Sequence, residues 1–163
     1  MFKVILIFSS VCFFAIQAAC PKDASVGPDG KCYVVLTNTV APYDWVHVEP
    51  YCKSRGGHSV SIHSKVVNSF LVNLMVSKGL QGIWTGLYCS QDSQYKYKWI
   101  DGTPVDYNNY YLASDQFPCS SSNPLYCGFL DNAGDWHSSP GAACNSNNRL
   151  PTWATACIVP STN

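Results

Sequence analysis

Charged residues are scarce in this 163-residue sequence, where Asp, Glu, Lys and Arg make up 12% of the chain. Ten basic residues balance ten acidic ones, so the formal net charge at pH 7 is zero. A neutral chain without a basic run creates no field that attracts a nucleic acid or an anionic membrane surface. We therefore expect no nucleic acid and no membrane among its partners.

Several patterns that mark catalytic or metal sites are also missing. The sequence has no Cys-x-x-Cys pair and no His-Glu-x-x-His pattern, and its histidines are His47, His58, His63 and His137. Since His58 and His63 are five positions apart across an expected strand and turn, we place them on opposite faces. No spacing of carboxylates suggests the close pair that a glycosidase needs. The sequence predicts neither an enzyme nor a histidine metal site, and it has no Asn-x-Ser/Thr acceptor for N-glycosylation.

The only long apolar run lies at the N-terminus. Lys3 precedes an apolar stretch from Val4 to Ile16, and the small residues Ala18 and Ala19 follow it. This stretch is shorter than the ~20 residues of a membrane-spanning helix and has the order of charge, apolar run and small residues found in secretory signals. We predict a signal peptide over residues 1–18 and a mature domain over residues 19–163, secreted to the extracellular space without a membrane anchor.

Nine cysteines are present, and Cys12 falls within the predicted signal peptide. The eight that remain are Cys20, Cys32, Cys52, Cys89, Cys119, Cys127, Cys144 and Cys157. In an exported chain an even number at this density predicts a disulfide framework, here of four bridges, although counting cannot choose the pairs. Such a framework leaves no thiol for nucleophilic catalysis.

Two apolar stretches form the expected centre of the fold. The run Gly82–Cys89 predicts a buried strand, in which Gly82 and Gly86 indicate that another backbone comes close. The stretch Tyr95–Ile100 alternates large apolar with cationic residues, which predicts a half-buried strand before a turn at Asp101-Gly102.

Two helices are expected before these strands in the chain. One is capped by Asp44, is short or bent because of Pro50, and ends at the glycine pair 56–57. The other begins after Ser64, has an apolar face and stops at Gly79; that face comprises Val67, Phe70, Leu71, Leu74 and Met75. Further strands are expected over residues 33–36, 125–130, around Trp136 and over 153–159.

Short sequence motifs in these elements resemble those of one known family. The strand contains Ile-Trp-Thr-Gly-Leu at 83–87, the turn Trp-Ile-Asp-Gly-Thr-Pro at 99–104, and Tyr-Asn-Asn-Tyr follows at 107–110. Together they resemble the central strands of the C-type lectin-like domain, and the likeness extends from about Cys20 to Val159. The resemblance implies an α+β C-type lectin-like fold, with two helices flanking antiparallel sheets and a long disulfide-tied loop region.

The same resemblance implies the disulfide pairs. Cys20 with Cys32 would staple the N-terminal hairpin of the family's long form, Cys52 would join Cys157, and Cys127 would join Cys144. Cys89 with Cys119 would tie the long loop to the end of the central strand. Cys89, an extra cysteine at the end of the central strand, and the altered calcium motifs described next resemble variants among secreted nematode C-type lectin domain proteins.

The calcium motifs of the sugar-binding members are altered at both places where they are expected. Asp115-Gln116-Phe117-Pro118 stands in place of a Glu-Pro-Asn type triplet, and His137-Ser138 follows Trp136 in place of Asn-Asp. The only glutamate, Glu49, belongs to the first expected helix. We predict no metal site and no cofactor of the usual kind. Ca²⁺ at an atypical site stays open, with oxygens from Asp115, Asn123, Asp131, Asn132 and Asp135, although Asp and Asn also favour turns.

The long irregular stretch between Gly102 and Pro124 is the expected binding region, since loops of this length are often functional. Candidate ligand-binding residues in it and in the strand beyond are Tyr110, Tyr111, Asp115, Gln116, Phe117, Asn123, Asp135 and His137. Trp84, Trp99 and Trp136 are expected in the core. The resemblance implies a secreted domain that binds a glycan or glycoprotein, in innate defence or in contact between host and microbe. The alternative is a protein-binding module that uses the same loop surface.

Overall fold

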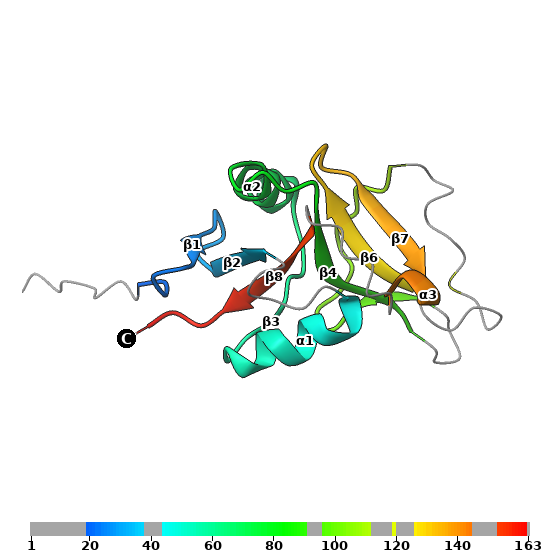
Figure 1. Cartoon of the computed structure of the whole chain (residues 1–163), viewed down its shortest axis with the longest axis horizontal. Helices are drawn as coiled ribbons and strands as arrows, with labels where there is room; N and C mark the ends of the chain where they lie inside the picture. The colour runs from blue at the N-terminus through cyan, green and yellow to red at the C-terminus, as the bar shows by residue number, and fades with distance from the viewer. Residues whose placement is uncertain are drawn as a thin grey trace, which may run out of the picture.

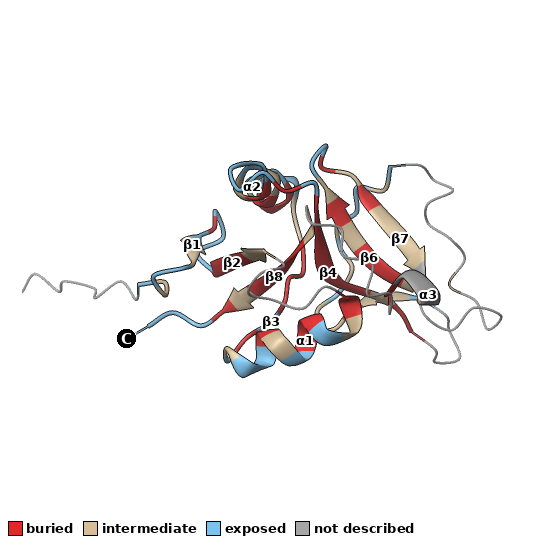
Figure 2. Ribbon diagram, viewed as in Figure 1, coloured by how far each residue is buried: buried red, intermediate tan, exposed pale blue. Residues whose placement is uncertain are grey.

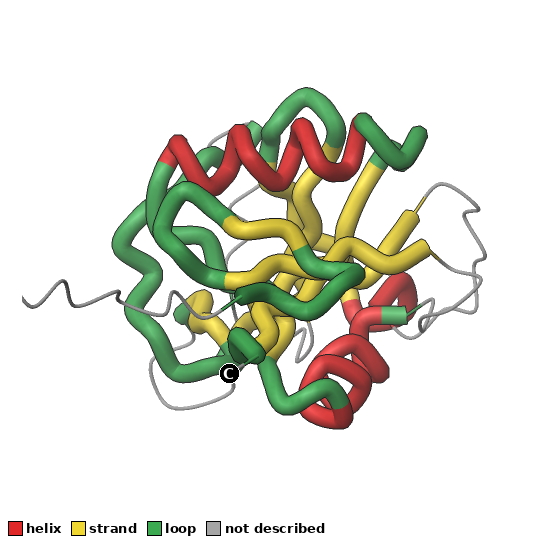
Figure 3. The backbone as a smooth tube through the Cα atoms, turned by 90° about the vertical axis from the view of Figure 1, so that its left-hand side faces the viewer, coloured by secondary structure: helices red, strands yellow, loops and turns green. Residues whose placement is uncertain are grey.

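The computed structural model describes residues 19–37, 44–90, 96–111, 119, 126–144 and 153–162. The elements in chain order are β1 (Ser25–Val26), β2 (Cys32–Thr37), α1 (Trp45–Ser54), β3 (His58–Ser59), α2 (Lys65–Val76), β4 (Gly82–Cys89), β5 (Tyr97–Trp99), β6 (Tyr126–Asp131), β7 (Trp136–Pro140), α3 (Gly141–Cys144) and β8 (Trp153–Val159). The two longer helices lie on opposite sides of the strands, α2 along one side and α1 along the other (Figure 1, Figure 3). No helix in these ranges is long and apolar enough to cross a membrane.

The strands form one sheet in the order β1-β2-β8-β4-β6-β7, with β3 paired to β8 and β5 paired to β4. This confirms the α+β class with two helices flanking the strands, with one correction to the sheet. β4 and β8 are parallel, with Gly82 opposite Trp153 and Trp84 opposite Thr155, so the sheet is mixed rather than antiparallel. The last strand inserts between β2 and β4, antiparallel to β2 and parallel to β4.

Helix α2 confirms the prediction made from its apolar spacing. The Ser64 side chain accepts a hydrogen bond from the backbone N–H of Val67 at 3.2 Å, which satisfies one of the free amides of the first turn. Leu71 and Met75 are fully buried on the inner face of the helix, while its outer side is exposed (Figure 2). Gly79 takes a φ of 69°, the left-handed conformation that ends a helix easily.

Helix α1 begins after Asp44 as predicted, but the capping mechanism differs. The Asp44 side chain makes no cap hydrogen bond, because its Oδ1 pairs with His47 Nδ1 at 2.5 Å instead. The helix continues through Pro50 to Ser54, and Gly56 with a φ of 78° follows. It is therefore a ten-residue helix with proline at an interior position.

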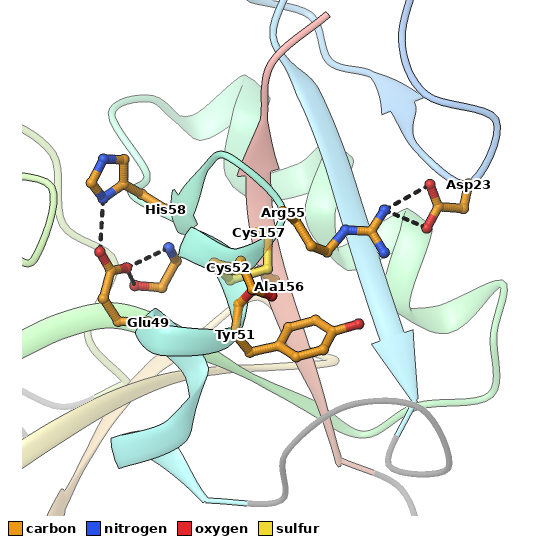
Figure 4. Close-up of a disulfide and its surroundings, with 10 residues drawn as sticks. Asp23, Glu49, Tyr51, Cys52, Arg55, His58, Ala156 and Cys157 are labelled. Atoms are coloured by element: carbon orange, nitrogen blue, oxygen red, sulfur yellow. Dashed lines mark hydrogen bonds and ion pairs between the residues drawn. A yellow bond between two sulfur atoms is a disulfide. The ribbon is translucent and has the colours of Figure 1, made fainter. Parts of the chain in front are cut away.

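A disulfide and a buried carboxylate fasten α1 to the sheet (Figure 4). Cys52 of α1 is bonded to Cys157 of β8. Glu49, 9% exposed, accepts hydrogen bonds from the backbone N–H and the hydroxyl of Ser59, both at 2.8 Å, and its other oxygen lies 2.8 Å from His58 Nδ1. The single glutamate of the chain thus has a structural role at the junction of α1 and β3.

The described residues form four disulfides, Cys20–Cys32, Cys52–Cys157, Cys89–Cys119 and Cys127–Cys144, which are the pairs that the resemblance implies. The central strand β4 lies between two apolar clusters. Trp99 and Trp136 are buried in the cluster beneath α2, and Trp84 is buried in the cluster beneath α1, as predicted. At Gly86 a Cβ atom would lie 3.2 Å from the backbone oxygen of Ser59, which confirms the close approach inferred from this glycine.

Candidate functional site

The structure describes half of the predicted ligand-binding set. Tyr110, Tyr111, Asp135 and His137 are described, and they lie on or beside β7. Asp115, Gln116, Phe117 and Asn123 lie outside the described residues.

Tyr110 and Tyr111 are neighbours in the chain with opposite environments. Tyr110 forms a β-bridge with Trp136, and its ring centroid lies 5.6 Å from that of Trp136 and 6.1 Å from that of Tyr97. Burial, with a smaller contribution from Tyr97, raises the pKa of Tyr110. The Tyr111 side chain points to solvent and is 59% exposed. Tyr110 therefore packs against the core, and Tyr111 is the one of the two that a ligand can reach.

The exposed Tyr111 begins a line of rings that crosses the sheet. Its ring centroid lies 5.5 Å from that of His137, and His137 stacks on Phe129 at 4.9 Å with an interplanar angle of 15°. Phe129 in turn lies 4.5 Å from Trp153. We call Tyr111, His137, Phe129 and Trp153 the aromatic row. Its members come from the segment after Tyr110, β7, β6 and β8, so the sheet brings together residues far apart in the sequence.

Asp131 holds His137 and the turn between β6 and β7. One carboxylate oxygen, Oδ2, lies 2.9 Å from His137 Nε2, while Oδ1 accepts the backbone N–H groups of Ala133 and Asp135, each at 2.9 Å. The predicted ligand residue Asp135 is thus positioned through its backbone. Sequence reasoning considered Asp131 for calcium but not as the partner of His137. The sequence signal for this role is the alternation of side chains along β6, which puts Phe129 and Asp131 on the same side of the strand.

Asn68 is a second supporting residue that sequence reasoning missed. It is buried on α2, accepts a hydrogen bond from Trp136 Nε1 at 2.7 Å and donates one to the Gly134 carbonyl at 2.9 Å. It therefore joins the helix to the first residue of β7 and to the turn before it. The sequence signal for this role was the position of Asn68 beside Val67 on the apolar face of α2, because a buried polar side chain needs a hydrogen-bond partner.

The described residues do not form a site suited to calcium. Among them, no three His, Cys, Asp or Glu side chains come together as a possible metal site. Both oxygens of Asp131 are already engaged, by His137 and by two backbone amides. Calcium takes six to eight oxygen ligands, so the oxygens near β7 do not supply the usual set.

One cluster has the outline of a catalytic triad. His63 Nδ1 lies 2.7 Å from Asp106 Oδ1, and His63 Nε2 lies 3.1 Å from the hydroxyl of Thr103. That hydroxyl donates its proton to Asp101 at 2.6 Å, and Ser61 donates to the other oxygen of Asp101 at 2.6 Å. A catalytic hydroxyl must donate its proton to the histidine, whereas the Thr103 hydroxyl donates its proton to Asp101. The network therefore serves to hold the turn after β5.

The carboxyl groups of this network have depressed pKa values. Burial alone would raise the pKa of Asp101, but hydrogen bonds from Ser61 and Thr103, together with nearby His63, outweigh it and hold the pKa below its usual value. The hydrogen bond from His63 lowers the pKa of the exposed Asp106. Both carboxylates are thus stabilised in their charged form in the folded protein.

The fold and the disulfides are those of a lectin-like domain, and comparison with known proteins identifies its family. Residues 41–150 match the family model described as the Lectin C-type domain. The chain therefore belongs to the C-type lectin family. It is 33% identical over 115 residues to Snaclec 3 of Sistrurus catenatus edwardsii, a match that covers 67% of this chain and 72% of the relative. Snaclec bothrojaracin subunit alpha of Bothrops jararaca is also 33% identical over 115 residues, covering 66% and 70%.

Solved structures share the fold at lower identity. The cow C-type carbohydrate-recognition domain of CD23 has a TM-score of 0.67 and 23% identity, covering 90% of this chain and 99% of that chain. A calcium-independent type II antifreeze protein has a TM-score of 0.67 and 21% identity, covering 88% and 96%. At these identities the likeness is one of fold, which a carbohydrate-recognition domain and an antifreeze protein share.

Proposed function

We propose that this protein binds carbohydrate at the exposed end of the aromatic row, without the calcium site of the sugar-binding members of its family. The observation that carries the proposal is the placement of Tyr111, 59% exposed, beside the hydrogen-bonded pair of His137 and Asp131. An exposed ring offers a flat apolar surface, and Asp131 Oδ2 beside it, which accepts one hydrogen bond from His137, has a second lone pair for a sugar hydroxyl.

This combination suits the surface of a sugar ring. A pyranose has an apolar face of C–H groups that packs on an aromatic ring, and hydroxyls at its edge that need hydrogen-bond partners. Asp131 is fixed by two backbone amides, and His137 is fixed by Asp131 and by stacking on Phe129. Groups held in place before binding lose little conformational entropy when a ligand arrives, which favours recognition by direct contacts.

A glycan array probed with the purified oxidised protein, once with calcium and once with chelator, tests the proposal. We expect the same bound glycans in both conditions. Tyr111→Ala should abolish binding, and Tyr111→Phe, which keeps the ring, should retain most of it. Val76→Ala on α2 removes another exposed apolar side chain, 53% exposed, and should change nothing. Unchanged binding by Tyr111→Ala would reject the site, and binding lost in chelator would reject calcium independence.

Export belongs to the same proposal. The apolar N-terminal stretch and the four disulfides support cleavage after Ala18 and an extracellular site of action, in defence or in contact between host and microbe. Intact mass of the protein secreted by expressing cells tests the cleavage. A chain that still carries residues 1–18 would reject the signal peptide.

Protein binding is the second candidate function. It is favoured by relatives that are named as subunits, such as Snaclec bothrojaracin subunit alpha and Snaclec botrocetin subunit beta, both of Bothrops jararaca. A glycan array without signal in both conditions, together with a chain that sediments as part of an assembly, would favour this candidate over the first.

A further inference from the structure

We propose that a groove between the N-terminal hairpin and α2 binds a polypeptide segment that presents aliphatic side chains next to a carboxylate. The groove has a volume of about 660 Å³, and Val26, Gly27 and Pro28 of the hairpin face Val66 and Phe70 of α2 across it. The hairpin strands β1 and β2 lie below α2 in Figure 1. This surface shares no residue with the aromatic row, so the inference does not depend on glycan binding.

The walls of the groove present apolar side chains to solvent. Val26 is 62% exposed and Val66 is 63% exposed, and they belong to opposite walls. A partner side chain lying between them would remove both from water, which is the main source of affinity in an apolar groove. The volume is that of a pocket that holds a few side chains of a ligand.

The groove is held open by a buried tyrosine beneath it. The Tyr33 ring packs edge-on against Phe70 of α2 at 5.5 Å, and its hydroxyl donates to Asp29 Oδ2 of the hairpin at 2.9 Å. The disulfide Cys20–Cys32 closes the base of the hairpin. Because one residue contacts both walls and a covalent bond fixes one of them, the groove exists before a ligand binds.

The charge at the groove determines the chemistry of the ligand. Lys65 lines it and makes no ion pair with any residue the structure describes. No Asp or Glu is among the described residues that line the groove or the hollow next to it. An aliphatic ligand that carries a carboxylate therefore gains an ion pair at Lys65 as well as apolar contacts.

The neighbouring hollow favours a polypeptide over a fatty acid. It has a volume of about 260 Å³ and shares Lys65, Ser69 and Asn73 with the groove. These three residues are spaced by four along α2, so they form one ridge on the helix. The side chains of Ser69 and Asn73 have no hydrogen-bond partner among the described residues. They can pair with the backbone amides of a peptide, whereas a hydrocarbon chain offers them nothing.

Three capped peptides test the inference by chemical-shift titration of the ¹⁵N-labelled oxidised protein. The first is acetyl-Gly-Leu-Leu-Asp-Gly-amide, the second has Asn for Asp, and the third has Ser for both Leu. We expect the first peptide to shift the amides of Val26, Val66 and Phe70 saturably, with a Kd on the order of 1 mM. The second should bind about 2- to 5-fold more weakly, because one exposed ion pair is lost. The third should not saturate.

Variants of the protein supply the controls. Lys65→Gln should weaken the first peptide to the level of the second and leave the second unchanged, which assigns the carboxylate to this lysine. Val66→Ser should weaken the first peptide about tenfold. Val76→Ser, the same change further along the exposed side of α2, should bind like the unaltered protein, as should Tyr111→Ala.

Several outcomes would overturn the inference. They are no saturable shift with the first peptide, shifts that map away from the groove, equal effects of Val66→Ser and Val76→Ser, or equal binding of the first two peptides. Hexanoate, a fatty acid with an aliphatic tail and a carboxylate, is titrated in parallel. Hexanoate that binds more tightly than the first peptide would assign the groove to fatty acids and reject a polypeptide ligand.

Discussion

Replacing Asn68 with alanine is expected to lower the free energy of unfolding by about 1–4 kcal/mol. The change leaves the Trp136 Nε1–H, which now donates to Asn68 at 2.7 Å, buried without a partner. An orphaned buried donor costs about 1–3 kcal/mol. The Gly134 carbonyl also loses its bond from Asn68, but it keeps the one from Asn109 at 2.7 Å, so this loss adds no more than about 1 kcal/mol.

Asn109→Ala is the matched control, because it removes the other amide from the same carbonyl. Asn109 is exposed and Gly134 keeps its bond from Asn68, so we expect a loss below about 1 kcal/mol. Equilibrium urea unfolding of the oxidised protein, followed by far-ultraviolet circular dichroism, measures both variants. A loss within about 0.5 kcal/mol for Asn68→Ala, or equal losses for the two variants, would refute the reasoning that the Trp136 donor dominates.

Two further predictions use the same unfolding assay. The folded pKa of Asp101 is lowered, so its carboxylate adds stability above the usual carboxyl pKa of about 4, and this part is lost as the pH falls through the folded pKa. Between pH 7 and pH 2 the unaltered protein should therefore lose more stability than Asp101→Asn, and parallel pH profiles would contradict this. Removing the bridge Cys52–Cys157, with a separation of 105 residues, should cost about 5 kcal/mol, against about 3 kcal/mol for Cys20–Cys32, with a separation of 12. A greater cost for the shorter loop would contradict the loop-entropy argument.

The elements with strong local signals were predictable from the sequence. The run Gly82–Cys89 is the central strand, and the apolar spacing after Ser64 is helix α2, because burial of one face imposes a period that the sequence displays. The closing strand Trp153–Val159 was likewise expected from its residues. Stretches with turn residues at both ends and a single period within them leave little choice of secondary structure.

Side-chain partners could not be predicted from the spacing of residues. Asp44 has the right residue type to cap α1, yet His47 takes its carboxylate, because two local hydrogen bonds compete for one group. Tyr110 and Tyr111 are the same residue type at adjacent positions, and the bridge to Trp136 decides that the first packs in the core and the second faces solvent. Neither outcome is encoded in spacing alone.

The sequence by itself determined the number of cysteines, the period of the main strand and helix, and which residues stand at 115–118 and 137–138, where the family's calcium motifs are expected. These properties are local, since they depend on residue type and on the alternation of apolar side chains. Only the tertiary structure decided that β8 lies parallel to β4, that Asp131 holds His137, and that the hairpin and α2 enclose a groove. Each of these requires strands or helices distant in the chain to meet, and the direction and register of such meetings are set by packing across the whole domain.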